Sequence, residues 1–466
     1  MKIYFQGDEG YEEARVGRVF NHRRPKRYPK AVFFPEDEKD VVAAVKLANR
    51  EGYKIAIRAG GHSWAAWSVR DDGILLDLKH FNIIKFNKKT KIAQVQPAVK
   101  GGMELNPFLR EHGRFFCGGH CPTVGVGGFL LQGGQGWNAR GWGWAVEYIV
   151  AIDVVTAEGE LVRADATQNQ DLYWAARGAG PGFFGVVTCF HLKTRPLPKA
   201  LYASTYLYPI DQAETVLNWW QVLHGTVSPN IELVLLGQTV PSVPNMEERH
   251  PELIGTEGSH IPVIIVHALV FEKTVKAALE ALKPFETCPV IDKAYVRKTN
   301  YETTFAKQLL LQTDANPEGH RWAVNNAWLE GEKDKITELL LPAFTELPNA
   351  KTFSLWYSMA PLRELPDMAF SLQTEIYFAS YVIWEDTEDD EKNKTWLKNI
   401  MKRIEPITAG QYLGDSDFTA HSRKFISDKN YEKLEQIRAK RDPQGRFHSY
   451  LANPETSLNR NDWALR

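Results

Sequence analysis

The chain has few cysteines and no long apolar segment. Its cysteines, Cys117, Cys121, Cys189 and Cys288, are too few and too scattered among 466 residues for a disulfide framework. Neither Cys117 nor Cys121 has His and Cys neighbours at metal-ligand spacing, so we expect no metal site. No uninterrupted apolar run approaches the roughly 20 residues that a membrane-spanning helix needs. A disulfide-stabilised, zinc-binding or membrane-spanning protein is therefore not expected.

The chain also lacks an excess of charge of either sign. Its formal net charge is −1, and no basic block is interleaved with aromatic residues. Nucleic-acid and anionic-membrane surfaces need clustered positive charge, so we expect neither partner. The first fifteen residues are acidic where a secretory signal needs an apolar stretch, which predicts an intracellular, cytoplasmic protein. A small molecule is the expected partner, for a monomer or homodimer.

The first part of the chain mixes helix and strand patterns. A helix is expected over 36–50, with acidic residues in its first turn and Gly52 placed to end it. Strands are expected over 54–58, 73–78 and 148–157, with another after Gly185. The proline-containing segment RPLPKA at 195–200 marks a boundary.

The pattern changes after residue 200. Strands predicted over 263–271, 353–358 and 375–384 alternate with amphipathic helices over 274–282 and 395–404, and a charged helix over 430–441 ends at Asp442-Pro443. At this length two domains are expected. The patterns predict an α+β protein.

Glycine is concentrated between residues 118 and 143, where ten of the 26 residues are glycine. Packed helices and strands do not favour this density. In this segment and in RAGGHSW at 58–64, small residues let backbone N–H groups converge on an anion such as a pyrophosphate. A dinucleotide is the natural ligand.

Two other interpretations of the glycines stay open at this point. Gly125-Val-Gly-Gly resembles part of a Rossmann fingerprint, but that motif needs a preceding strand and an acidic residue about 20 positions later. The preceding FFCGGHCPTV is a poor buried strand. The glycines could also build tight turns without binding anything.

Several motifs in order carry a family resemblance: RAGGHSW, CPTVGVGG, GGQGW, DLYWAARGAG, Gly185-Val-Val, NYEKL and DPQGRF. The chain resembles the berberine-bridge-enzyme-like branch of the vanillyl-alcohol oxidase flavoprotein family over residues 1–200 and 410–466. The resemblance implies a two-domain FAD-linked oxidase fold. Residues 1–200 plus 406–466 would form a discontinuous FAD-binding domain, and 201–405 a central substrate-binding domain with a β-sheet covered by helices.

The resemblance also implies that FAD is attached covalently at two points. In that branch, the histidine of the GGH motif bonds to the flavin 8α methyl and the cysteine of CPTVG to ring carbon C6; the matching residues are His62 and Cys121. A neutral imidazole nitrogen and a thiolate are suitable nucleophiles, and removing ring electron density raises the redox potential. Without its motif, His62 would be interpreted as a hydrogen-bonded turn histidine. The CPTVG register selects Cys121 over Cys117.

By the same resemblance, other residues of these motifs surround the cofactor. They are Arg58, Ala59, Gly60, Gly61, Ser63, Pro122, Thr123, Val124, Gly125, Gly127, Gly128, Gly133, Gly134, Trp137, Arg140, Glu147 and Val187. Val124 stands where family oxidases have valine and dehydrogenases a bulkier residue. Oxygen is therefore the expected electron acceptor, with hydrogen peroxide as its product.

The chain departs from the family at three places, of which the second and third concern the substrate pocket. Phe183 stands where an Asn is common, Tyr412-Leu-Gly-Asp415 replaces Tyr-x-Asn-Tyr, and AFSLQTE at 369–375 replaces a segment with Phe-Pro-His-Arg. Oxidation needs a base for the proton lost as hydride leaves for flavin N5. The candidates are Tyr412, Asp415, Glu375, Tyr357, Tyr377 and His120. The alternative for Tyr357 and Tyr377 is packing in the core, and for Glu375 and Asp415 it is a solvated surface position. The alternative for His120 is a side chain that points away from the flavin.

The sequence thus predicts an FAD-dependent oxidase that takes hydride from a small organic substrate, namely an alcohol, a carbohydrate or a secondary metabolite. Two alternatives remain. The protein could be a flavin dehydrogenase or an oxidative-cyclisation enzyme, or it could carry flavin without turnover, which the departures keep open. Neither the substrate nor the base is determined by these motifs.

Overall fold

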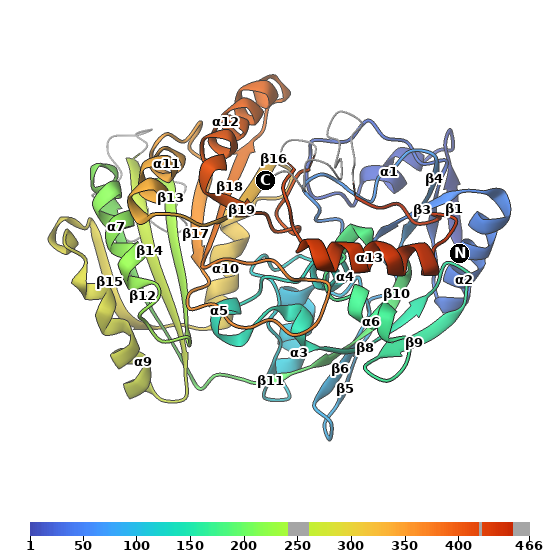
Figure 1. Ribbon diagram of the computed structural model, residues 1–466, viewed down its shortest axis with the longest axis horizontal. Helices are drawn as coiled ribbons and strands as arrows, with labels where there is room; N and C mark the ends of the chain where they lie inside the picture. The colour runs from blue at the N-terminus through green and yellow to red at the C-terminus, as the bar shows by residue number, and fades with distance from the viewer. Residues whose placement is uncertain (241–260, 419–421, 451–466) are drawn as a thin grey trace.

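The computed structural model describes residues 1–240, 261–418 and 422–450. Figure 1 shows two halves side by side: the first 200 residues on the right, with the C-terminal helix α13 packed on them, and a large sheet with its helices on the left. The chain passes from the first half to the second through β11 (Arg195–Pro196) and β12 (Ala200–Pro209). This crossing coincides with the boundary expected from RPLPKA.

A four-stranded sheet forms the outer part of the first half. Its strands in order are β1 (Lys2–Phe5), β2 (Ala31–Phe34), β4 (Gly73–Asp77) and β3 (Lys54–Arg58). Helix α1 (Tyr11–Val16) precedes β2, and α2 (Glu38–Glu51) connects β2 to β3. The Asp37 side chain accepts a hydrogen bond from Asp40 N at the start of α2, and Gly52 ends the helix with a left-handed φ of 70°. The predicted helix and both strands are confirmed.

A five-stranded antiparallel sheet lies beside it. Its strands in order are β5 (Ile84–Asn87), β6 (Ile92–Val95), β10 (Val186–Lys193), β8 (Ile149–Val155) and β9 (Leu161–Asp165). A short ribbon pairs β7 (Arg114–Phe115) with β11. Helices α3 (Asn106–Arg110) and α6 (Gln170–Ala175) complete this half.

The glycine-rich segment differs from its prediction in one respect. We expected no helix there, yet α4 (Val126–Leu131) and α5 (Ala139–Trp142) lie within it. Both are short, and glycines with positive φ follow them, Gly133 at 116° and Gly143 at 89°. The glycines therefore limit the helices rather than exclude them.

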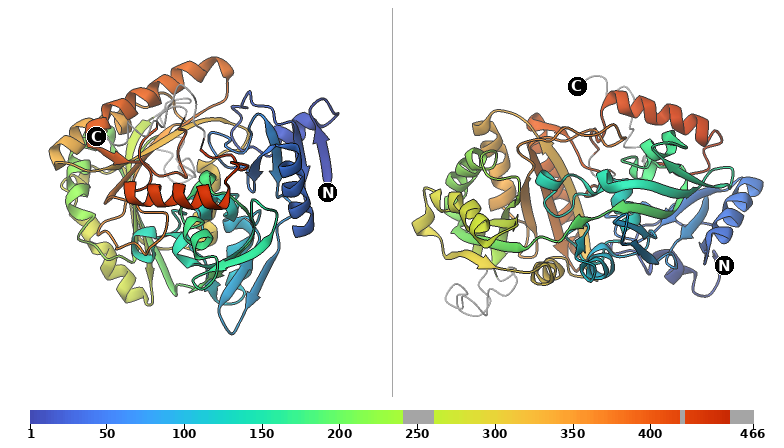
Figure 2. Two further views of the ribbon diagram at one scale, coloured as in Figure 1. Left: turned by 45° about the vertical axis from the view of Figure 1, so that its right-hand side comes forward. Right: turned by 90° about the horizontal axis from the view of Figure 1, so that it is seen from below.

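The second half is built on an eight-stranded antiparallel sheet. Its strands in order are β15 (Val296–Glu302), β12, β14 (Ile261–Glu272), β13 (Ile231–Val240), β17 (Phe353–Ser358), β18 (Ile376–Trp384), β16 (Arg321–Leu329) and β19 (Thr408–Gly410). Helices α7 (Ala213–Leu223), α9 (Val275–Leu282), α11 (Lys333–Thr345) and α12 (Asp390–Arg403) cover one face, as Figure 2 shows. Helix α10 (Phe305–Ala315) lies on the other side, toward the first half.

Alternation along the strands decides which residues face the covering helices. Tyr206, Leu233, Val266 and Trp356 are fully buried in one apolar cluster with the residues of these helices. Their neighbours in sequence point to the opposite face, toward the first half. That face of the sheet is free to contribute to a site between the halves.

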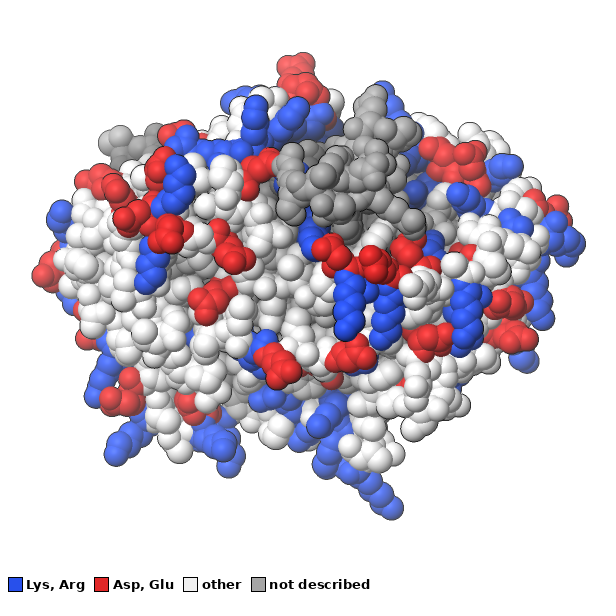
Figure 3. Space-filling model, in the orientation of Figure 1, with Lys and Arg blue, Asp and Glu red and all other residues white. Residues whose placement is uncertain are grey.

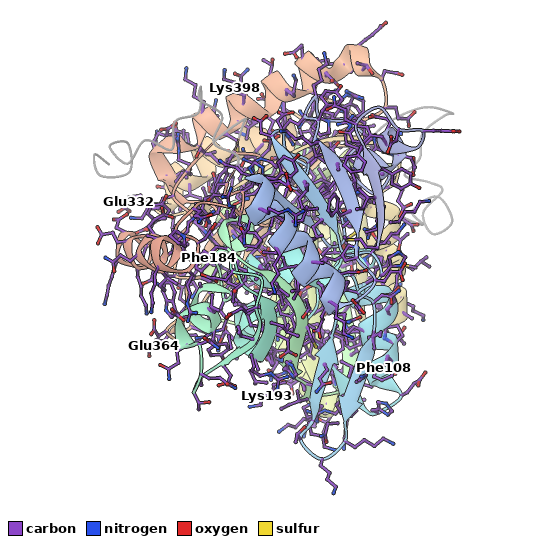
Figure 4. All side chains as sticks on the ribbon, turned by 90° about the vertical axis from the view of Figure 1, so that its right-hand side faces the viewer. Phe108, Phe184, Lys193, Glu332, Glu364 and Lys398 are labelled. Carbon is purple, nitrogen blue, oxygen red and sulfur yellow. The ribbon has the colours of Figure 1, made fainter. Side chains whose placement is uncertain are left out.

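The C-terminal segment returns to the first half. Helix α13 (Asp428–Arg441) pairs Arg441 with Asp171 of α6 at 2.6 Å, and Phe447 forms a parallel bridge with Ile55 of β3. In Figure 4 the labelled Phe184 lies in the interior beside this segment, whereas the labelled charged residues lie at the periphery. Arg438 stacks its guanidinium 5.9 Å from the Phe184 ring centre. Residues 451–466 lie outside the described residues.

The face of the molecule drawn in Figure 3 carries both signs of charge. On the face drawn in Figure 3, Lys and Arg side chains are interspersed with Asp and Glu, most clearly along α13. No described helix combines the length and apolar character needed to cross a bilayer.

Candidate functional site

A cavity of about 510 Å³ lies between the glycine loops of the first half and the uncovered face of the eight-stranded sheet. Strand β3, the glycine-rich segment, helix α10 and the loop that follows β19 contribute to its wall, together with strands β12, β13, β14, β15, β17 and β18. The cavity is therefore formed by residues from nearly the whole length of the chain. It brings RAGGHSW and CPTVGVGG to the same place.

The two glycine loops meet at backbone contact distance. A Cβ on Gly60 would lie 2.7 Å from Gly125 N, and one on Gly61 would lie 1.8 Å from Arg18 O, where φ is +78°. Side chains at these positions are excluded by the protein itself. Gly128 differs: an added Cβ would meet no protein atom within 4 Å, although Gly128 lines the cavity. The space in front of Gly128 is thus available to a ligand.

Arg58 does not supply charge to a ligand, although it borders the cavity. Its guanidinium is buried and bonds the Asp77 carboxylate, with Nε 2.7 Å from Oδ2. It also donates to the backbone carbonyls of Ala14 and Arg15. Any anion in this part of the cavity would therefore have to be held chiefly by backbone N–H groups.

His62 and Cys121 both line the cavity. The His62 ring stacks on Phe20 with 4.4 Å between ring centres, and burial, assisted by the Lys100 charge, lowers its pKa to about 4. The imidazole is therefore neutral at neutral pH. Burial raises the pKa of the Cys121 thiol, whose Sγ lies 3.6 Å from Thr123 Oγ1. Cys117 is fully buried and lies outside the cavity lining, in agreement with the choice of Cys121.

Most other residues expected near a cofactor also line the cavity. They are Arg58, Ala59, Gly60, Gly61, Ser63, Val124, Gly125, Gly127, Gly128, Trp137 and Val187. Six lie outside its lining: Pro122, Thr123, Gly133, Gly134, Arg140 and Glu147. Arg140 instead donates to backbone carbonyls such as Ala360 O, and Glu147 pairs with Arg363. Arg140 and Glu147 therefore contribute to packing between the two halves.

Gln135 and His448 are among the lining residues that the sequence analysis missed. Gln135 Nε2 and His448 Nε2 are buried and have no hydrogen-bond partner among the described residues. A buried unpaired polar atom is costly unless a ligand or water satisfies it. Gln135 stands inside the GGQGW motif, which could have identified it, and His448 follows DPQGRF directly.

One carboxylate of the site belongs to Asp415. It accepts hydrogen bonds from Tyr377 OH at 2.9 Å and Trp64 Nε1 at 3.2 Å. Burial, and then the Asp415 charge, raise the pKa of the Tyr377 phenol well above its ordinary value, so this proton stays on Tyr377. Asn326 Nδ2 bonds the backbone oxygen of Asp415 at 2.8 Å and holds the loop. The Asp415 carboxylate is thus held at the cavity wall by residues of both halves.

A second carboxylate, Glu232 of β13, was missed by the sequence analysis. It accepts from His120 Nε2 at 3.0 Å, Tyr357 OH at 3.0 Å and Asn138 N at 2.5 Å. Burial acts to raise the pKa of the Glu232 carboxyl, but the His120 charge and these hydrogen bonds together lower it. Its signal in the sequence is a single acidic residue within the apolar strand IELVLLGQTV. The Glu232 carboxylate brings His120 and Tyr357 together.

The remaining two base candidates have different surroundings. Tyr412 lines the cavity, and its hydroxyl accepts from Gly134 N at 3.0 Å and Gln135 N at 3.2 Å. Burial, and then the Asp415 charge, raise its pKa, so Tyr412 supports the glycine loop as a neutral phenol. Glu375 is exposed and lies outside the cavity lining, because it precedes the first residue of β18. The structure does not bring Glu375 to the other candidates.

The sequence matches a known domain and a known fungal protein. Residues 29–165 match the model of the FAD binding domain. The FAD-linked oxidoreductase janO of Penicillium janthinellum is 36% identical over 444 residues, which are 94% of this chain and 94% of that protein. The likeness thus extends over nearly the full length of both proteins.

Solved structures share the fold at low sequence identity. A crystal structure of 6-hydroxy-D-nicotine oxidase from Arthrobacter nicotinovorans superposes with a TM-score of 0.82 at 18% identity, covering 97% of this chain and 98% of that one. Berberine bridge enzyme from Eschscholzia californica superposes with a TM-score of 0.79 at 18% identity, covering 96% and 95%. The chain thus shares its α+β fold with these structures.

Proposed function

This chain belongs to the FAD-linked oxidoreductases, and on that premise we propose that it is an oxidase whose FAD is attached covalently through His62 and Cys121. Held by the glycine loops, FAD would supply a hydride acceptor for an organic substrate, and its reoxidation by oxygen would give hydrogen peroxide. The observation that carries the proposal is that His62 and Cys121, 59 positions apart in sequence, line one cavity together with the glycine loops.

The residues of the cavity fit FAD. The open space in front of Gly128 admits a ligand against the backbone, and backbone N–H groups suit a pyrophosphate. The unpaired Gln135 Nε2 and His448 Nε2 are available to polar groups of a ligand. Both loops and both unpaired atoms border the same cavity, so one extended ligand can satisfy them together.

The two attachment residues differ in whether the protonation state at neutral pH suits a nucleophile. His62 is neutral at neutral pH because burial lowers its pKa to about 4, so a ring nitrogen retains its lone pair. Burial keeps Cys121 protonated, so its attachment needs a proton acceptor within the cavity. Thr123, whose Oγ1 lies 3.6 Å from the sulfur, opposes this effect by stabilising the thiolate.

We assign proton removal from the substrate to Asp415. Its carboxylate borders the cavity and is oriented by Tyr377 and Trp64. Tyr377 comes from the eight-stranded sheet, and Asp415 follows its last strand. We therefore propose that residues 1–200 with 406–466 form the FAD-binding domain and that 201–405 form the substrate-binding domain, with the reaction at their interface.

The attachment is tested by denaturing the purified protein in trichloroacetic acid and measuring flavin absorbance in the pellet and the supernatant. We expect the yellow colour in the pellet for the wild type and for either single variant, His62→Ala or Cys121→Ala, since one tether remains. In the double variant the flavin is released into the supernatant.

Cys117→Ala is the matched control, because Cys117 is buried outside the cavity lining. It retains a yellow pellet even when His62 is also replaced by Ala. Release of all flavin from the denatured wild type would refute covalent attachment. Peroxide release measured over a library of alcohols, carbohydrates and phenols tests the oxidase assignment, and slow reoxidation by air would indicate a dehydrogenase instead.

A further inference from the structure

The uncovered face of the eight-stranded sheet carries two rows of side chains that run across the strands. In the first row, residues on neighbouring strands pair directly opposite one another. It consists of Lys298, Thr205, His267, Val234, Tyr357 and Tyr377. Every one of them lines the cavity. This first row contacts the first half of the molecule, since Tyr357 OH accepts a hydrogen bond from Ala139 N at 3.1 Å.

The second row lies two residues from the first on each strand, on the same face of the sheet, and its side chains differ in chemistry. It consists of Val296, Leu207, Ile265, Leu236 and Leu355, paired in that order across β15, β12, β14, β13 and β17. All five line the cavity, and all are branched aliphatic residues. We call this set the aliphatic row. It presents no hydroxyl, amide or charged group.

The members of the aliphatic row differ in accessibility. Leu207, Ile265 and Val296 are buried and pack against one another in a small apolar cluster. Leu236 and Leu355 are only partly buried, although they stand side by side at the centre of the sheet. These two leucines therefore offer apolar surface to a molecule in the cavity.

We propose that the aliphatic row binds a hydrocarbon skeleton, so that the substrate is a mainly apolar molecule with one oxidisable polar group. This inference rests on the proposed function and specifies its substrate class. The polar group lies toward Tyr357, Tyr377 and Asp415, and the apolar body lies against Leu236 and Leu355.

Solvation decides between this class and an oligosaccharide. A sugar pressed against the aliphatic row exchanges hydrogen bonds with water for contacts that offer neither donor nor acceptor. A hydrocarbon skeleton instead removes both its own surface and that of Leu236 and Leu355 from water. The row thus favours hydrocarbon over carbohydrate at the same molecular size.

The test compares two probes of similar two-ring shape, 4-cyclohexylcyclohexanol and xylobiose. Each is titrated into the purified holoprotein by isothermal calorimetry, for the wild type and for Leu236→Asn and Leu355→Asn. Leu310→Asn is the matched control, since Leu310 is 58% exposed on α10. Flavin absorbance and melting temperature of every variant establish that the fold and the cofactor are retained.

We expect the wild type to bind the bicyclic alcohol more tightly than xylobiose, and each row variant to lose about tenfold of that affinity, which corresponds to ~1.4 kcal/mol. The control binds as the wild type does. Tighter binding of xylobiose, unchanged affinity in both row variants, or binding of neither probe would overturn the inference. A colourless protein would refute the proposed function instead, and the calorimetry would still report on the row.

Discussion

Asp415 and Glu232 both line the cavity, but the two carboxylates differ in burial and in their hydrogen-bond partners. Glu232 is almost fully buried and is engaged by His120, Tyr357 and a backbone N–H. Asp415 is engaged by Tyr377 and Trp64 at the cavity wall. We therefore expect Asp415 to act on a substrate and Glu232 to hold its neighbours in place.

Asp415→Asn removes the proposed proton acceptor while keeping the side-chain shape. We expect flavin reduction by substrate to slow by about 10²- to 10⁴-fold, the usual contribution of a positioned base. Anaerobic stopped-flow absorbance measures the rate, with a substrate found by peroxide release. Glu375→Gln is the control, because this carboxylate is exposed outside the cavity, and it retains the wild-type rate. An Asp415→Asn variant as fast as the wild type would exclude this role.

Glu232→Gln tests the second carboxylate through stability. The folded-state pKa of Glu232 lies below its ordinary value, so its ionised form stabilises the fold above the unfolded-state pKa, and this contribution is lost as pH falls through the folded pKa. We expect the variant to lose roughly 1–3 kcal/mol of unfolding free energy at pH 7, since the buried donors lose a charged acceptor.

Denaturant unfolding of wild type and Glu232→Gln at pH 7 and at pH values below the unfolded-state pKa measures this difference. The gap between the two proteins narrows toward low pH, where the wild-type carboxyl becomes protonated. A gap that stays constant or widens at low pH would show that the carboxylate charge does not contribute.

Among the elements, helix α4 contains two neighbouring glycines with different surroundings. Gly127 packs tightly, because an added Cβ would lie 2.8 Å from Pro97 Cβ and 2.9 Å from Ala59 Cβ. Gly128, its neighbour, faces open space in the cavity. Gly127 thus serves packing of the loops, whereas Gly128 leaves room for a ligand.

Gly128→Ala separates folding from cofactor binding. Alanine favours a helix over glycine by up to about 1 kcal/mol, and its methyl group meets no protein atom, so we expect the fold to be retained. The methyl group occupies ligand space, so flavin content per protein falls. Absorbance at 450 nm relative to 280 nm and circular dichroism measure the two effects.

Gly61→Ala provides the contrast. Its φ is +78° and its Cβ would meet Arg18 O at 1.8 Å, so it destabilises the fold itself. If Gly128→Ala retains full flavin content, then the space in front of Gly128 is not used by FAD.

At the scale of the whole molecule, the two halves share one apolar core. A single cluster joins Leu76, Val126 and Phe190 of the first half to Trp328 and Tyr377 of the eight-stranded sheet. The C-terminal segment adds a bridge from Phe447 to Ile55. Separation of the halves would expose this shared core.

We therefore predict one cooperative thermal transition for the holoprotein. Far-UV circular dichroism reports on both sheets, and visible flavin absorbance reports on the interface between the halves. The two midpoints coincide, because loss of either half exposes the apolar cluster that the two halves share. Separate midpoints, with the eight-stranded sheet melting apart from the flavin signal, would contradict this coupling.

The sequence alone determined the features that depend on neighbours along the chain. Strand and helix bounds followed from local alternation and capping, as with β3, β17 and the Gly52 end of α2. The cofactor motifs could also be recognised in the sequence, because His62 and Cys121 stand within short glycine-containing motifs. Gln135 was available in the same way and was overlooked.

Only the tertiary structure decided which distant residues meet. His120 and Glu232 are 112 positions apart, and Trp64 and Asp415 are 351 apart, so no local pattern relates them. The aliphatic row exists only through strand register, which is set by pairing between strands far apart in the chain. The exposure of Glu375, one residue before β18, likewise depends on where the paired strand begins. Motifs predicted the cofactor because its chemistry is local, whereas the substrate side depends on long-range packing.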